Sequence, residues 1–191
     1  MKKIFAFIAV SLLAACNSNE SSKDDGMSPS KDSTMSTMSA MPVPIQSPDY
    51  KIGYSSSFVM DDPKNAESVL KLWKIWDDGD LSKSKDIFGD NDTLYLADGT
   101  VLTGPKDSII ASSQKFRSSL VSSVSRVDAI MAVKSTDRNE HWALIWGMEK
   151  DSSKGKVDSF FLQETWRFNN DGKADMLYQF RHAAAPPKTM K

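Results

Sequence analysis

The final two strand-like segments of the chain carry side chains whose types and spacing suit acid–base chemistry. Asn170-Asp171-Gly172 is typical of a three-residue hairpin loop with its glycine in a left-handed bulge position. Such a loop places Arg167 beside Asp175 and Glu164 beside Tyr178, and this register keeps the apolar residues of both strands on one face. The sequence therefore predicts a carboxyl–phenol pair across the hairpin.

The predicted face around this pair is aromatic. Phe160 and Trp166 share it with Glu164, and His182 lies further along it. Apolar neighbours favour the neutral form of a carboxyl, which is how enzymes obtain a general base or acid that works near neutral pH. Glu164 and Tyr178 are thus candidate catalytic residues, while Trp166 and His182 are candidate ligand contacts. The alternative is a structural pair, in which Glu164 and Tyr178 only satisfy each other's hydrogen bonds.

A second chemically distinctive position is Cys16, the single cysteine of the chain. Lys2-Lys3 precede an apolar run from Ile4 to Leu13 that is too short to span a bilayer, and the small Ala14-Ala15 suit a signal peptidase. We therefore interpret residues 1–15 as a lipoprotein signal peptide and Cys16 as the acceptor of lipid, with an ordinary secretory peptide as the alternative. Several acyl chains, such as palmitate, give stable anchoring. We expect the mature protein to be a membrane-anchored lipoprotein of the cell envelope, outside the cytoplasm on the outer membrane.

The composition of residues 16–60 predicts a disordered tether. Ser, Thr, Met, Asp, Lys and Pro dominate it, and such a segment buries too little apolar surface to offset its ordering entropy. Ser22-Lys23-Asp24-Asp25 resembles the export signal of some Bacteroidetes lipoproteins, which would expose the protein at the cell surface. Met35, Met38 and Met41 offer thioether sulfurs that suit Cu(I), although a low-complexity segment explains the same residues without a metal.

Charge and motif content narrow the function classes. The formal net charge is -1, and it becomes -3 when residues 1–15 are removed with their two lysines and no acids. A mildly acidic chain without a basic stripe is not typical of a nucleic-acid binder. There is no glycine-rich phosphate loop, nucleophile elbow or Cys/His metal spacing, so we expect no nucleic acid partner and no metal or other cofactor.

Residues 61–185 have the size of one domain, followed by a tail at 186–191. A first helix is expected to begin after Asp62, as N-cap, and Pro63, and to end at Gly79. A short second helix is expected from Leu81 to Phe88. A third helix is expected to begin at Gly104-Pro105 and to run toward Leu120. Strands are expected at residues 93–97, 100–103, 121–133, 140–149, 157–168 and 173–181. Helices followed by antiparallel strands predict an α+β fold.

The predicted strand from Glu140 to Glu149 is apolar on both faces. Trp142 and Trp146 alternate with Ala143 and Ile145. A sheet with such a strand is covered on both sides, and the helices cover only one. We therefore expect a homodimer through the other side.

Three passages resemble the nuclear transport factor 2-like superfamily, and within it the SnoaL-like bacterial proteins. They are Leu72 to Asp80, Asp98 to Gly104, and Trp166 to Lys173. The resemblance covers residues 64–182 and implies a curved antiparallel sheet packed on about three helices into a cone, with an apolar pocket that Trp76 lines. The family includes isomerases, dehydratases, cyclases, epoxide hydrolases and non-catalytic ligand binders. The Asp/Arg/Asp and His/Asp sets of its enzymes do not map onto this sequence.

Three functions are therefore open. The favoured interpretation is a lipid-anchored protein that binds a small apolar or amphipathic ligand. The second is an isomerase- or dehydratase-type enzyme with Glu164 as general base and Tyr178 as donor to a developing oxyanion. The third is an interaction module that docks a partner through its sheet face.

Overall fold

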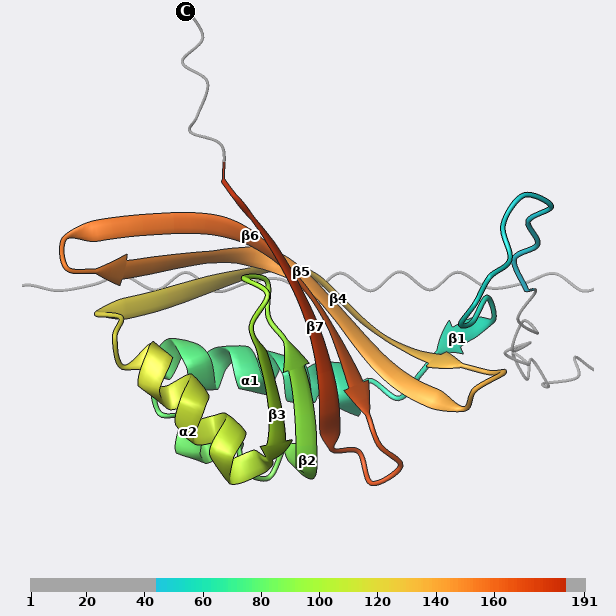
Figure 1. Ribbon diagram of the computed structural model, residues 1–191, viewed down its shortest axis with the longest axis horizontal. Helices are drawn as coiled ribbons and strands as arrows, with labels where there is room; N and C mark the ends of the chain where they lie inside the picture. The colour runs from blue at the N-terminus through green and yellow to red at the C-terminus, as the bar shows by residue number, and fades with distance from the viewer. Residues whose placement is uncertain (1–43, 185–191) are drawn as a thin grey trace, which may run out of the picture. The chain divides into compact units, whose positions relative to one another are not determined.

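The computed structural model describes residues 44–184, and Figure 1 shows how their helices and strands are arranged. Cys16, the methionines Met35, Met38 and Met41, and the tail 186–191 lie outside the described residues. The elements, in chain order, are β1 (Phe58–Met60), α1 (Lys64–Asp78), the short 3-10 helix η1 (Leu81–Ser84), β2 (Phe88–Tyr95), β3 (Val101–Pro105), α2 (Lys106–Arg117), β4 (Ser122–Ser135), β5 (Glu140–Ser153), β6 (Lys156–Phe168) and β7 (Ala174–Ala183).

Helix α1 begins and ends at the signals that predicted it. The Asp62 carboxylate accepts the Lys64 amide at 3.0 Å, as an N-cap side chain does, although the helix starts one residue after Pro63. Gly79 ends it in the left-handed region at φ 84°, where its amide reaches the Ile75 carbonyl at 3.0 Å.

The predicted helix from Leu81 to Phe88 is wrong beyond its first turn. The Asp80 carboxylate accepts the Ser82 hydroxyl at 2.6 Å and stabilises η1, which ends at Ser84. Phe88 then begins β2 and is buried. Residues 44–184 therefore contain two α-helices rather than the expected three.

The strands form one sheet in the order β1-β4-β5-β6-β7-β2-β3. Neighbouring strands are antiparallel except β2 and β7, which are parallel, so the sheet is mixed rather than wholly antiparallel as predicted. The β6–β7 hairpin fixes the direction of β7. One edge of β2 pairs with β3, and its other edge pairs with β7. The α+β class is confirmed.

The predicted tether ends before Met60. Phe58–Met60 form β1 and pair with Ser135 to Val133 of β4 at one edge of the sheet. Ser57 just before them is buried. The ordered domain thus begins at least three residues earlier than the expected boundary at Asp61.

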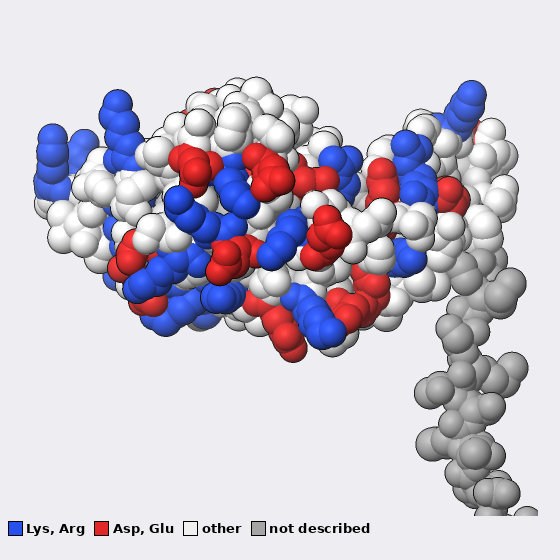
Figure 2. All heavy atoms as spheres, turned by 90° about the horizontal axis from the view of Figure 1, so that it is seen from below, with Lys and Arg blue, Asp and Glu red and all other residues white. Residues whose placement is uncertain are grey.

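Both helices lie on one side of the sheet, as Figure 1 shows. Helix α1 packs on β4 and β5, and α2 packs on β2 and β3. Figure 2, which views the molecule from below, shows Lys and Arg intermixed with Asp and Glu on that surface. In the described part of the chain, no helix is long and apolar enough to cross a membrane.

A bulge at Asp175 sets which residues of β7 face the helices. Phe168 pairs with Ala174, as the predicted loop requires, but Arg167 pairs with Met176, so that Asp175 is an extra residue in β7. The bulge brings Ala174 and Leu177, three residues apart, onto the same buried side. Regular alternation would place one of them in solvent.

Candidate functional site

A cavity of about 460 Å³ lies between the two helices and the inner face of the sheet. Most of its lining is apolar or aromatic, as in typical small-molecule sites: Leu72, Trp73, Ile75, Trp76, Leu81, Phe88, Leu94, Leu96, Leu102, Ile109, Ile110, Phe116, Phe160, Leu162, Trp166 and Leu177. Three buried acidic side chains, those of Glu149, Asp151 and Glu164, also line it.

Glu164 is held in the cavity wall by three N–H donors. The indole of Trp73 donates to its Oε2 at 2.7 Å, the indole of Trp166 donates to the same atom at 2.9 Å, and the amide of Gln179 donates to Oε1 at 2.9 Å. Glu164 is only 5 % exposed. Such a network compensates the burial of a carboxyl and fixes its orientation.

A glycine on β5 allows Trp73 to reach Glu164. Gly147 lies beside Trp73, and a Cβ atom there would lie 2.3 Å from the Arg126 carbonyl oxygen and 2.8 Å from the Trp73 ring, closer than side chains tolerate. Because glycine has no side chain, the Trp73 indole can lie directly against the backbone of β5. The pairing of Ile145 with Glu164 then puts the carboxyl on the adjacent strand within reach of the Trp73 N–H.

The structure does not bring Tyr178 or His182 to this site. Because of the bulge at Asp175, Gln179 lies across from Glu164, and the predicted pairing with Tyr178 is wrong. Tyr178 stacks on Tyr95, with 5.0 Å between ring centroids, on the side of the sheet away from the helices. His182 is exposed beside Phe161.

One predicted contact of the hairpin and the predicted positions of two tryptophans are found in the structure. Arg167 Nε donates to Asp175 Oδ1 at 2.8 Å, which confirms the predicted ion pair. Trp166 and Trp76 both lie in the cavity wall. The Trp76 ring stacks on Phe116 at a centroid distance of 6.1 Å.

Glu149 and Asp151 are the acidic residues that the sequence-based prediction missed. They are neighbours on the inner side of β5, each 8 % exposed, and Asp151 Oδ1 has no hydrogen-bond partner among the described residues. Burial raises the pKa of Glu149 to about 8, and the negative charges of Asp151, Glu164 and Asp77 add to the effect. Glu149 therefore carries a proton at neutral pH, next to the Asp151 carboxyl.

One sequence signal does point to this pair. Ala143, Ile145 and Gly147 form the small and apolar inner series of β5, and continuing it in steps of two reaches Glu149 and Asp151. Two carboxyls at this spacing on a buried strand face meet at close range, where like charges favour sharing a proton.

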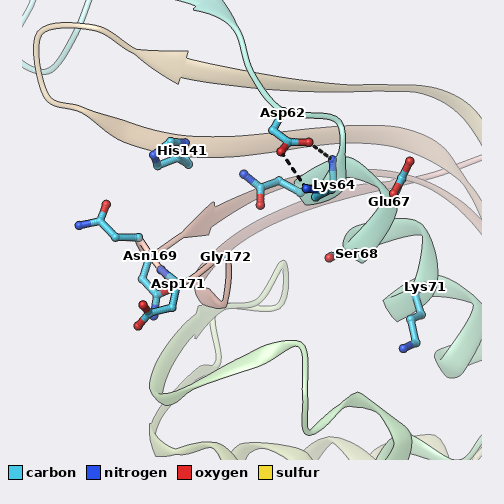
Figure 3. A pocket seen from close by; sticks show the side chains of 11 residues that line it. Asp62, Lys64, Glu67, Ser68, Lys71, His141, Asn169, Asp171 and Gly172 are labelled. Carbon is cyan, nitrogen blue, oxygen red and sulfur yellow. Dashed lines mark hydrogen bonds and ion pairs between the residues drawn. The ribbon is translucent and has the colours of Figure 1, made fainter.

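A second hollow of about 560 Å³ is open and polar (Figure 3). It lies between the start of α1 and the β6–β7 turn, with Asp62, Lys64 and Asp171 among its lining residues. Asp62 and Lys64 are paired with each other there, and the nearby His141 contacts Asp61 at 2.7 Å. Two of its charged side chains are thus paired with each other. Across residues 44–184, no group of three or more His, Cys, Asp and Glu side chains is arranged to hold a metal ion.

Comparison with known proteins shows the fold alone. No protein-family model matches the sequence, and no curated protein matches it. Solved structures that match include a putative SnoaL-like polyketide cyclase from Shewanella denitrificans, with 12% identity, a TM-score of 0.52 and coverage of 63% of this chain and 92% of that chain.

Two further matches carry different names. An NTF2-like protein of unknown function from Burkholderia pseudomallei has 16% identity, a TM-score of 0.50 and coverage of 63% and 90%. An LEH-like epoxide hydrolase from M. tuberculosis has 8% identity, a TM-score of 0.52 and coverage of 62% and 83%. The chain thus shares the fold of SnoaL-like and NTF2-like proteins.

Proposed function

We propose that this protein binds a small, largely apolar molecule in the cavity between its helices and its sheet. The observation that carries the proposal is the cavity itself, about 460 Å³ in volume and walled by aromatic and aliphatic side chains around a few fixed polar groups. The buried Glu164 network supports it, because oriented polar groups in an apolar wall select how a ligand lies.

Native mass spectrometry of the purified full chain tests this proposal, together with calorimetric titration of a neutral probe, 1-octanol. We expect saturable binding of one octanol per chain. Leu102→Trp should abolish binding by filling the cavity, because Leu102 lines it and is partly buried. Val157→Trp is the matched control, since Val157 is 57% exposed on β6. Octanol binding that survives Leu102→Trp would contradict this location.

A second candidate function, an acid–base enzyme of the isomerase or dehydratase type, is favoured by the Glu149–Asp151 pair. A protonated Glu149 supplies a proton to a carbonyl or leaving hydroxyl oxygen, and Asp151 accepts one from carbon. We assign the acid–base role to these residues rather than to Glu164, whose oxygens already accept three N–H bonds. Cyclases and epoxide hydrolases among the proteins of similar fold are consistent with this candidate.

Exchange of α-protons in D2O tests the enzyme candidate without a known substrate. A hydrophobic enolisable ketone such as 2-octanone should lose its α-protons faster with the protein, as followed by NMR. Asp151→Asn should lower the protein-catalysed rate of exchange by about 100-fold or more, which is the range typical of a general base. Equal exchange with and without protein leaves ligand binding as the function.

We also propose that the protein is held at a membrane by lipid on Cys16 and that it pairs with a second copy through its outer sheet face. The signal-like residues 1–15 support the first proposal. Exposed apolar side chains on that face, such as Phe180 at 58%, support the second.

A further inference from the structure

The ionisable side chains that line the cavity are mostly acidic. Among the described residues that line it, Asp98, Glu149, Asp151 and Glu164 are acidic, and Arg181 is the single basic one. Arg181 lies over the Phe160 ring, 4.4 Å from the guanidinium carbon to the centroid, and no ion pair within 4.0 Å joins it to any of the four acids. Within residues 44–184, the buried carboxyls of Glu149, Asp151 and Glu164 therefore form no ion pair with a Lys or Arg side chain.

Cross-strand pairing connects each of the Glu149 and Asp151 carboxyls to a nearby aromatic residue. Glu149 is the cross-strand partner of Phe160, whose ring already faces one cation. Asp151 is the cross-strand partner of Ser123, and the Ser123 hydroxyl accepts the Trp76 indole N–H at 3.0 Å. Aromatic faces and carboxylates together are the groups that proteins use to recognise ammonium head groups.

Asp151 gives an independent indication of a ligand site. Its side chain is more than nine-tenths buried and lines the cavity, and its Oδ1 atom has no hydrogen-bond partner in the described chain. A buried carboxylate oxygen without a partner is costly, and a cation or donor in the cavity removes that cost.

We propose that the cavity binds an organic cation with an apolar tail, and that its ammonium head group lies between the carboxyls of Glu149 and Asp151 and the rings of Phe160 and Trp76. This inference rests on the proposed binding function and names its ligand class. The apolar walls hold the tail. The head group replaces the proton that the two carboxyls share in the free protein, and this proton leaves to the solvent.

Three probes of equal chain length test the charge preference by calorimetry on the full chain: 1-octanol, octyltrimethylammonium and octanoate. We expect the ammonium compound to bind at least about tenfold more tightly than octanol, because one charged contact in a buried site contributes about that much affinity. Octanoate should bind most weakly. Equal binding of octanol and the cation, or tighter binding of octanoate, overturns the cation site but leaves the cavity as a binding site. No binding of any probe overturns the proposed function as well.

Isosteric neutral variants locate the contact. Asp151→Asn and Glu149→Gln should each weaken octyltrimethylammonium binding about tenfold, and by more than they weaken octanol binding. Asp158→Asn is the matched control, because Asp158 pairs with Asp151 across the strands but is exposed and does not line the cavity. An equal loss in Asp158→Asn would show a general effect of net charge and would overturn the direct contact.

The pH dependence tests the proton exchange, because octyltrimethylammonium does not titrate. The charged groups that act on Glu149 are Asp151 on β5, Glu164 on β6 and Asp77 on α1. Arg181 on β7 also lines the cavity, and Arg117 on α2 donates to the backbone carbonyl of Asp77. Affinity should rise by up to about tenfold per pH unit below pH 8 and then level off, with matching proton release in buffers of different ionisation enthalpy. A flat profile without proton release overturns the proposal.

Discussion

Glu149 makes the free energy of unfolding of this protein depend on pH. Burial raises its pKa from 4.5 to about 8, so between these values the folded chain keeps a proton that the unfolded chain has lost. The free energy of unfolding contributed by this group is therefore greatest below about pH 4.5, falls as pH rises toward 8, and is constant above that.

We predict that Glu149→Gln removes this part of the pH dependence. Gln keeps the shape of a protonated glutamate, so stability should change little at pH 5 and rise by about 1–3 kcal/mol at pH 8.5 relative to the native chain. Urea unfolding at both pH values measures it, with the exposed Asp158→Asn as control. A parallel shift at both pH values would contradict a buried, protonated Glu149.

Asp92 on β2 is a second buried acid, outside the cavity. It is 3% exposed, neither carboxyl oxygen has a hydrogen-bond partner in residues 44–184, and burial raises its pKa to about 7. We predict that Asp92→Asn raises the free energy of unfolding by about 1–3 kcal/mol at pH 8 and has little effect at pH 4. Thermal unfolding checks this against Asp90→Asn, an exposed neighbour. Destabilisation at pH 8 would mean that the charged carboxylate has a partner.

At the scale of elements, Trp73 of helix α1 packs on the sheet and forms a hydrogen bond with it. Its indole packs against Gly147 of β5 and donates to Glu164 of β6, so one side chain joins three elements. The fit depends on the bare backbone of β5 at this position. A side chain at position 147 would clash with the Arg126 carbonyl of β4 as well as with the Trp73 ring.

We predict that Trp73→Phe lowers the free energy of unfolding by about 1–3 kcal/mol, because it removes an N–H donor from a buried carboxyl. Trp146→Phe is the control, since Trp146 alternates to the other side of β5 and is only partly buried. Denaturant unfolding of both variants gives the comparison. Equal effects would show that Trp73 stabilises by packing alone.

At the scale of the whole molecule, no helix within residues 44–184 covers the outer side of the sheet. Phe161, Tyr178 and Phe180 are 37%, 37% and 58% exposed there. We predict that the full chain sediments as a dimer and that Phe180→Lys shifts it to monomer without loss of thermal stability, because the change affects only an exposed position. A native chain that remains monomeric at high concentration would exclude pairing through this face.

Membrane attachment is also a property of the whole chain. We predict that Cys16→Ala moves the protein from the detergent phase to the aqueous phase, because the lipid acceptor is lost and a single apolar run of ten residues cannot span a bilayer. Detergent partitioning and membrane fractionation in high salt measure it. Retention of the variant in the membrane fraction would contradict the lipoprotein interpretation.

The sequence by itself determined the features that depend on near neighbours. Gly79 ends α1 because a left-handed residue there needs no side chain, and the Asn170-Asp171-Gly172 loop sets the first pair of the last hairpin and its Arg167–Asp175 ion pair. Alternation of apolar residues located β4 to β7 to within a few positions. These signals are local, so they can be read along the chain.

Only the tertiary structure decided which side chains meet in the cavity. One extra residue at Asp175 turns Tyr178 and His182 outward and brings Gln179 to Glu164, because Ala174 and Leu177 are both buried in the core. On the second half of β7 the polar Gln179 consequently faces the cavity while the aromatic Tyr178 and Phe180 face outward. The polarity of the residues along this strand predicts the opposite arrangement. The charge state of Glu149 depends on acids from α1 and β6 that lie far away in sequence, and only packing brings them together.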